Sequence, residues 1–244
     1  EVTPIVLPAE AAISYYESSA LAWEQAAFIR ARAAAGDKAL GDYFLKSIQP
    51  FVWRRSLDFG QLANIRKMSG QIRDHYHKGQ VLGPGYDLKR GRGGIRECEF
   101  FAQAHQLIHG GRDPGLRMAD TRTALAALAE RERIGADEAA TLASAYQLLR
   151  TIEHRLQMLD DRQTHSLPEN TADLDRAARL HGLADGEALV ALLEPVVTNV
   201  GAIYDGLAGE EDESTQRLAD EGLPLEDQLS TLGYTDPPAV AQRL

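Results

Sequence analysis

Residues 87–108 read DLKRGRGGIRECEFFAQAHQLI, a glycine-rich, cationic segment that runs directly into a helix-forming one. Gly91, Gly93 and Gly94 follow Lys89 closely, and glycine lets backbone N–H groups approach a ligand. A helix N-terminus adds unpaired N–H donors and a partial positive charge. The segment therefore predicts a phosphate-binding loop at the start of a helix, with a flexible turn carrying solvated cations as the alternative.

The helix expected over residues 94–109 is apolar around most of its circumference. At about 100° per residue, its polar side chains share a stripe about 80° wide, which consists of Arg96, Glu99, Gln103 and Gln106. A helix of this kind is buried, so the stripe predicts a wet cleft or a buried polar network. The alternative is an Arg96–Glu99 ion pair beside surface glutamines.

Outward from this segment, the chain is rich in Ala, Leu, Glu, Arg and Gln, which predicts helices almost throughout. The longest is expected over residues 136–164, where acids occupy the first turn and apolar residues recur at helical spacing. Only Val2–Leu7, β-branched and interrupted by proline, is typical of a strand. The fold class is therefore mostly α, a multi-helix bundle with at most a short N-terminal strand remnant. The remaining helices are expected at 9–18, 20–35, 37–48, 58–78, 119–131, 172–182, 185–208 and 212–220.

The net charge of the 244-residue chain is −10, and it is unevenly distributed. Residues 54–122 carry 13 Lys/Arg and 7 Asp/Glu, a net charge of +6 between two acidic ends. The overall acidity excludes a general nucleic-acid coat protein, while the basic middle is where an anion is expected. Cys98 is the only cysteine, and we expect neither a membrane-spanning run nor a signal peptide. These features favour a cytoplasmic protein that binds neither membrane nor nucleic acid.

An ordered set of motifs resembles the family of bifunctional glutamine synthetase adenylyltransferase/adenylyl-removing enzymes. The strongest spans Lys89–Gln103 and contains Gly-Gly-Ile-Arg-Glu. The others are Trp23–Arg32, Pro50–Phe59 and Leu149–Pro168, in the order that the family has them. The resemblance covers roughly residues 10–208, and the Gly-Gly-Ile-Arg-Glu form is similar to the N-terminal half of the family, which removes AMP.

The resemblance implies a nucleotidyltransferase that regulates nitrogen assimilation. In that family, phosphate attacks the AMP–tyrosine phosphodiester on glutamine synthetase and yields ADP, and the other half adenylylates the same protein with ATP. Glutamine synthetase is then the protein substrate and a PII signal protein the regulator. The implied domains are the end of a nucleotidyltransferase sheet (1–8), a helical segment packing on the catalytic domain (9–83), a helical domain with the glycine-rich loop and long helix (84–208), and an acidic linker with the start of a further helical unit (209–244).

The family works with Mg²⁺ and with ATP, ADP and phosphate. Its metal carboxylates come from a Gly-Ser…Asp-x-Asp turn, a motif that this sequence lacks. By the order of the motifs, those carboxylates are expected upstream of Glu1. We therefore expect this chain to hold no metal and no catalytic residue, to be inactive alone, and to supply a helical wall of the deadenylylating site.

The predicted nucleotide- and phosphate-binding residues are Lys89, Gly91, Gly93, Gly94, Arg96, Glu99, Arg30 and Arg32. Among them, Glu99 is expected to orient Arg96 or a water molecule, and the two residues of the earlier helix are second-tier candidates. Three positions depart from the family pattern: Gln25 stands where Arg is expected, Arg30 where Lys is, and Cys98 where a β-branched residue is.

Two other functions compete with the enzyme hypothesis. The chain could be a helical docking module that binds glutamine synthetase or a PII signal protein, a hypothesis motivated by the acidic residues 123–244. Loop mutations would then change partner affinity and leave the chemical step intact. Alternatively, the basic segment could bind RNA, which predicts a steep dependence of affinity on salt.

Overall fold

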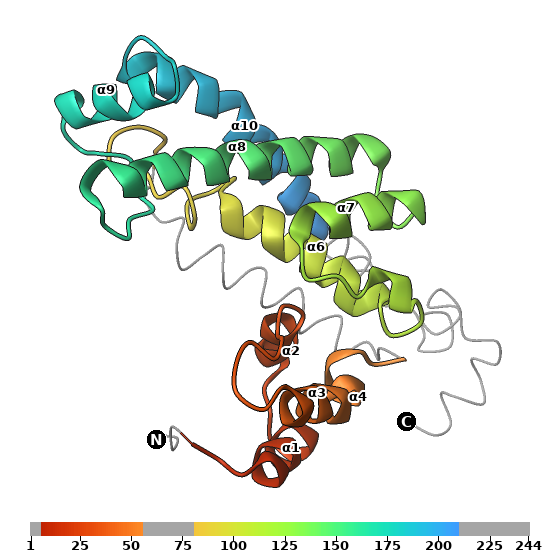
Figure 1. Cartoon of the computed structure of the whole chain (residues 1–244). Helices are drawn as coiled ribbons and strands as arrows, with labels where there is room; N and C mark the ends of the chain where they lie inside the picture. Colours follow the sequence, from red (N-terminus) through yellow and green to blue (C-terminus); the bar gives the residue numbers. More distant parts are fainter. Residues whose placement is uncertain (1–5, 56–80, 210–244) are drawn as a thin grey trace, which may run out of the picture. The chain divides into compact units, whose positions relative to one another are not determined.

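The computed structural model describes residues 6–55 and 81–209, and the regular structure within these ranges is helical (Figure 1). The β pairing that occurs there is one isolated bridge between Asp87 and Ser166. The mostly α fold class is thus confirmed. The helices expected at 58–78 and 212–220 lie outside the described residues, as does most of the expected strand remnant.

Four short helices form the first part of the described chain: α1 (Ala9–Ser18), α2 (Ala22–Phe28), α3 (Lys38–Ser47) and α4 (Gln49–Val52). Aromatic rings hold them together, because the Tyr16 ring lies 4.7 Å from Phe28, 5.9 Å from Phe44 and 5.5 Å from Phe51 between centroids. The side chain of Asp37 caps α3 by accepting from the Leu40 amide at 3.0 Å.

The second part contains α6 (Ile95–His109), the 3₁₀ turn η1 (Pro114–Leu116), α7 (Thr121–Glu130), α8 (Ala136–Asp160), α9 (Thr171–Leu180) and α10 (Gly186–Gly209). Residues 1–204 form one compact unit and residues 205–244 a second. The core of the first unit is built where α6, α8, α9 and α10 bring leucines and isoleucines together, and its fully buried members include Leu88, Ile95, Leu149, Leu189 and Leu193. This core places the start of α6 beside the end of α8.

Helix boundaries differ most from the sequence prediction at the ends of α2 and α8. The helix expected at 20–35 ends at Phe28, and the chain turns there so that Ile29 is buried. Tertiary contacts of this kind override the helix propensity of the alanine-rich residues that follow. The long helix ends at Asp160 because Asp161 adopts the left-handed conformation, with φ of 48°. The short helices α4 and η1 were not predicted as helices.

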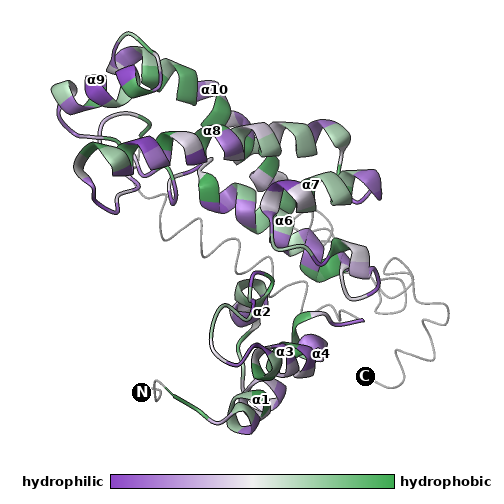
Figure 2. Cartoon of the chain, viewed as in Figure 1, coloured by the Kyte–Doolittle hydropathy of each residue, from purple (hydrophilic) through white to green (hydrophobic). Residues whose placement is uncertain are grey.

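Within the described residues, α10 is long and apolar enough to cross a membrane by length and composition, with a mean hydropathy of 1.4 over Gly186–Leu207 (Figure 2). The expectation that no segment approaches this is therefore wrong for α10. A helix in a protein core passes the same test, and Leu189, Leu193 and Val200 on α10 are fully buried. Core packing accounts for these three residues, while 33% of the apolar window is buried in all.

A candidate phosphate-binding cleft

The backbone amides of the three loop glycines already have acceptors within the protein. Gly91 donates to the Asp87 carbonyl at 2.8 Å, and Gly94 donates to the Gly91 carbonyl at 3.0 Å. Gly93 donates to the Glu97 carboxylate at 2.8 Å. A backbone phosphate cradle needs amides that point at the ligand, so these contacts give no support to direct phosphate binding by the glycines.

The first turn of α6 is satisfied in the same way. The amides of Ile95 and Arg96 donate to the carbonyls of Leu88 and Lys89, both at 2.9 Å. Two donors that the sequence analysis expected to face an anion are therefore occupied. The same contacts fix the backbone of Lys89 against the start of α6.

Packing explains why two of these positions are glycine. Gly93 has φ of +73°, and a Cβ atom there would lie 1.9 Å from the carbonyl oxygen of Val197 on α10. At Gly91 a Cβ atom would lie 2.6 Å from both the Tyr86 ring and the carbonyl oxygen of Asp87. The loop is thus a tightly packed turn, in which glycine is needed for close approach of other groups.

Cationic side chains from the loop and from α6 meet the α2 region at a cleft of about 370 Å³. Four of the predicted binding residues line it: Lys89, Arg96, Glu99 and Arg30. Its other lining residues are Trp23, Ala26, Ala27, Phe100 and Gln103. A cleft is therefore present along the polar stripe of α6, and three cations line it. The loop glycines and Arg32 are not among its lining residues.

Gln106 is the member of the stripe that does not face this cleft. It is 2% exposed, and its side-chain amide donates to the carbonyl of Leu116 at 2.7 Å and to that of Met118 at 2.8 Å. The stripe thus serves both purposes considered from sequence, a cleft at one end and a buried polar network at the other.

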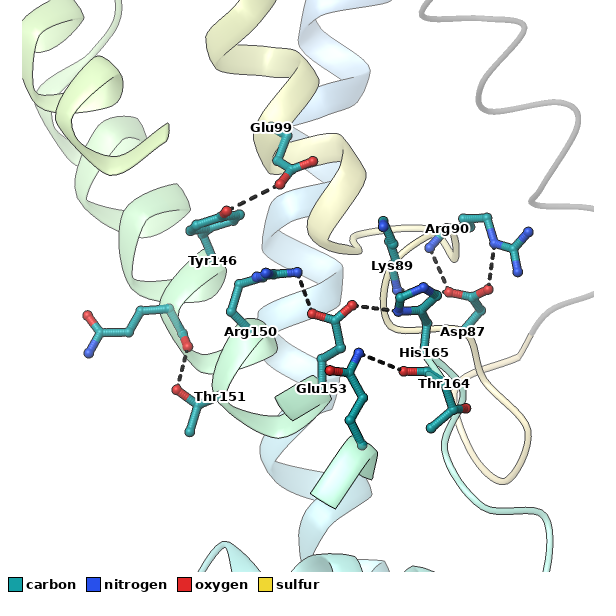
Figure 3. A network of polar contacts seen from close by, with 12 residues as sticks. Asp87, Lys89, Arg90, Glu99, Tyr146, Arg150, Thr151, Glu153, Thr164 and His165 are labelled. Atoms are coloured by element: carbon teal, nitrogen blue, oxygen red, sulfur yellow. Dashed lines mark hydrogen bonds and ion pairs between the residues drawn. The ribbon is translucent and has the colours of Figure 1, made fainter. Parts of the chain in front are cut away.

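Glu99 is bonded differently from the sequence expectation, which made it orient Arg96 or a water. Its carboxylate accepts from the Arg30 guanidinium at 3.1 Å and from the Tyr146 hydroxyl at 3.2 Å (Figure 3). Arg30 also donates to the Thr121 hydroxyl at 2.5 Å. Burial, followed by the Glu99 charge, raises the pKa of Tyr146 above its ordinary value, so this phenol stays protonated and donates. Glu99 therefore joins α6 to α8 and to the chain after α2.

Asp87 organises the loop beneath Lys89. It is 4% exposed, and its carboxylate accepts from the amides of Lys89 and Arg90 at 2.9 Å and from the Arg90 side chain at 2.8 Å (Figure 3). Burial alone would raise the pKa of Asp87, but these hydrogen bonds outweigh it and lower the pKa below the ordinary value. The carboxylate is therefore ionised near neutral pH and holds the backbone at Lys89 in place.

Sequence reasoning missed Glu153 on α8, which is fully buried. Its carboxylate lies 2.5 Å from Arg150 and 2.6 Å from the imidazole of His165. A signal was available, since Glu153 is four residues after Leu149 and three before Leu156, on the apolar face of the helix. An acid at such a position needs a buried partner.

Among residues 6–55 and 81–209, no group of three or more His, Cys, Asp or Glu side chains is arranged to hold a metal ion. Two carboxylates close to the cleft already have partners within the protein: Glu99 binds Arg30, and Asp87 binds its own loop. The described residues therefore do not fit a Mg²⁺ site.

The geometry defines a helical domain with a cationic cleft, and comparison with known proteins assigns its family. Residues 64–208 match the family model described as GlnD PII-uridylyltransferase, and residues 1–47 match the model described as Glutamate-ammonia ligase adenylyltransferase. Since the first match covers more than half of the chain, the chain belongs to that nucleotidyltransferase family.

Three similar proteins carry the name bifunctional glutamine synthetase adenylyltransferase/adenylyl-removing enzyme. That of Agrobacterium fabrum is 42% identical over 98% of this chain, and that of Caulobacter vibrioides 43% over 98%. That of Rhizobium meliloti is 46% identical over 86% of the chain. The resemblance predicted from the motifs is thus confirmed. The chain spans 25%, 25% and 21% of the length of these relatives, respectively.

Proposed function

We propose that this chain forms a helical wall of the site that removes AMP from glutamine synthetase in a bifunctional adenylyltransferase. The observation that carries the proposal is the convergence of Lys89, Arg96 and Arg30 on one cleft. The names of the similar proteins support the reaction class. Within this proposal the protein acts in the cytoplasm and regulates nitrogen assimilation through its adenylyltransferase half as well.

The cleft residues suit a phosphorolysis reaction, in which inorganic phosphate attacks the phosphorus of the AMP–tyrosine phosphodiester. The bond to the tyrosine oxygen breaks, the tyrosine hydroxyl is regenerated and ADP is formed. Such transfers require positioning and charge neutralisation more than covalent help from the protein. Lys89 and Arg96 would neutralise the attacking phosphate or the phosphates of ADP. Arg30 is already paired with Glu99, so its role would be to shape the cleft and present its remaining N–H groups.

An aromatic residue gives the cleft a second property that fits a nucleotide. Trp23 lines the same cleft and is 56% exposed, so its ring is open to a ligand. Indole faces stack on nucleobases, and a base on Trp23 would complement phosphates held by the cations. We therefore propose AMP and ADP, together with ATP in the other half, as the nucleotides of the enzyme, with Mg²⁺ held outside the described residues.

The test is kinetic and uses the full-length enzyme. Lys89→Ala and Arg96→Ala are each expected to lower the rate of phosphate-dependent AMP removal from adenylylated glutamine synthetase by about a hundredfold, or about 2.7 kcal/mol of transition-state stabilisation. Adenylylation by the other half, measured in the same preparation, should persist. Circular dichroism checks that each variant is folded.

Two exposed cations provide matched controls. Lys46 on α3 and Arg122 on α7 are exposed, and neither lines the cleft. Lys46→Ala and Arg122→Ala should therefore leave AMP removal within about twofold of wild type. If Lys89→Ala and Arg96→Ala behave like these controls, the cleft is not part of the deadenylylating site.

A docking function is the second candidate, favoured by a separate and mainly apolar groove of about 430 Å³ between α8 and α10. Its lining residues include Ala145, Leu148 and Val196. Under this alternative, glutamine synthetase or a PII signal protein binds the helical surface, and Lys89→Ala changes partner affinity without changing the rate at saturating substrate. The kinetic test above separates the two, because only the enzyme hypothesis predicts loss of the saturated rate.

A further inference from the structure

Glu153 is a fully buried acid whose two carboxylate oxygens bind groups of different elements. Oε2 lies 2.5 Å from the Arg150 guanidinium on the same helix. Oε1 lies 2.6 Å from Nδ1 of His165, in the segment after α8 (Figure 3). Burying a carboxylate costs free energy unless it is paired, and apolar residues surround this position on α8. Leucine at this position would stabilise the core as well, so we expect the acid to have a specific role.

His165 connects that acid to the glycine-rich loop. Its backbone carbonyl accepts from the Leu88 amide at 2.8 Å, directly before Lys89. One residue pair further, the Leu167 amide donates to the Tyr86 carbonyl at 2.9 Å. The segment after α8 thus holds residues 86–88 in place by backbone hydrogen bonds. Glu153 is the side chain that fixes this segment to α8.

Two series of contacts therefore lead to Lys89. From one side Asp87 binds the Lys89 amide, and from the other Glu153 acts through His165 and Leu88. The first series is local to the loop. The second series fixes the position of the whole loop relative to α8. The same helix contributes Tyr146, whose hydroxyl donates to Glu99 of the cleft.

We infer that Glu153 is a positioning residue, which acts through His165 to hold the loop that presents Lys89 to the cleft. The expected effect of Glu153 on AMP removal rests on the proposed function, whereas its effect on the position of the loop does not. The inference goes beyond that function, because Glu153 is not among the lining residues of the cleft.

The first experiment measures amide hydrogen exchange in this chain. Glu153→Gln keeps the size of the side chain and removes its charge. The amides of Leu88 and Gly91 are expected to exchange at least about tenfold faster relative to the Ala124 amide of α7, which bonds to the Asp120 carbonyl at 2.9 Å. A general loss of stability would instead raise the exchange rates of all three amides together.

The second experiment measures AMP removal by the full-length enzyme at varied phosphate concentration. Glu153→Gln is expected to raise the KM for phosphate by about tenfold with a smaller change in kcat, because Lys89 remains present but poorly placed. His165→Leu removes the hydrogen bond to Glu153 from the loop side and should give the same shift. The double variant should be no worse than either single one, since both act through one contact.

Asp137→Asn is the matched control, since Asp137 is an exposed acid in the first turn of the same helix. It should change neither the exchange ratio nor the KM. The inference is overturned if Leu88 and Gly91 exchange no faster relative to Ala124 in both Glu153→Gln and His165→Leu. It is also overturned if both variants keep the wild-type KM while Lys89→Ala abolishes AMP removal. If Lys89→Ala itself is without effect, the proposed function fails, and the exchange ratio still decides the positioning role.

Discussion

The guanidinium of Arg30 lies 3.1 Å from the carboxylate of Glu99, although 69 residues separate them in the chain. The pair joins the turn after α2 to the polar face of α6, and Tyr146 adds a hydrogen bond to the same carboxylate oxygen. The Arg30 side chain is 37% exposed, so solvent weakens the ion pair. Its main contribution is therefore to position the two side chains and not to stabilise the fold. The pair fixes one edge of the cleft.

Arg30 and Arg32 can be distinguished by this geometry, although both are second-tier candidates in the sequence-based prediction. Arg30→Ala is expected to lower AMP removal by about tenfold, because the cleft loses both a cation and the partner of Glu99. Arg32 is exposed and does not line the cleft, so Arg32→Ala should stay within about twofold of wild type. Steady-state assays of the two variants side by side check this, and equal losses would contradict the placement of the cleft.

Trp23 should report nucleotide binding by its fluorescence. The chain has two tryptophans, and Trp53 packs under the Arg117 guanidinium at 5.5 Å, away from the cleft. In a Trp53→Phe variant, AMP and ADP should quench the remaining emission in a saturable way, whereas inorganic phosphate should not. Replacing Trp23 by Ala should weaken AMP binding, measured by calorimetry, by about tenfold. Unchanged affinity in that variant would mean that the base binds elsewhere.

Gly93→Ala should destabilise the chain strongly. Two penalties combine, the left-handed backbone and a Cβ atom placed 1.9 Å from the Val197 carbonyl oxygen, and the expected loss is about 3 kcal/mol or more. Gly182 has φ of +80° but open space around its Cβ position, so Gly182→Ala should cost only about 1–2 kcal/mol. Urea denaturation followed by circular dichroism gives both values. Similar losses at the two positions would show that the contact with α10 is not tight.

His105 should make the chain acid-sensitive. Burial, with a smaller effect of His109, lowers its pKa from 6.5 to about 4, and its Nδ1 atom has no hydrogen-bond partner. A histidine that is harder to protonate in the folded state contributes stability that is present above pH 6.5 and lost as the pH falls toward 4. The total loss is about 3 kcal/mol, and His105→Leu should remove most of it.

Denaturation at several pH values between 8 and 4 measures this effect. The exposed His154 is the control, since His154→Gln should leave the slope of stability against pH unchanged. A His105→Leu variant with the same slope as wild type would show that other groups cause the acid sensitivity.

The sequence predicted the helices well where periodicity and end signals agree. The start of α8 at Ala136 and the start of α1 at Ala9 were predicted correctly, because Gly135 with the acids that follow it and Pro8 mark them locally. The early end of α2 was not predictable, since it depends on Arg30 meeting Glu99 and Thr121, two partners far away in the chain. Local propensity contains no information about such contacts.

For the cleft, the sequence identified the side chains better than the backbone. Arg96 and Glu99 were found because a polar stripe on an apolar helix has few explanations, and Lys89 was found as a cation in the glycine-rich loop before that helix. The glycines were read as an anion cradle, but their amides are used inside the loop. That outcome could not be foreseen, because it follows from the close approach of α10 at Gly93 and from the side chain of Glu97.

The bridge between Asp87 and Ser166 has a consequence for the order of folding. The loop before α6 takes its shape from a segment that follows α8, and α6, α7 and α8 lie between the two partners in the chain. Contacts between residues so distant in sequence form late, because the entropy of closing the intervening chain is lost first. The loop that presents Lys89 should therefore be among the last parts of this unit to reach its native conformation during refolding.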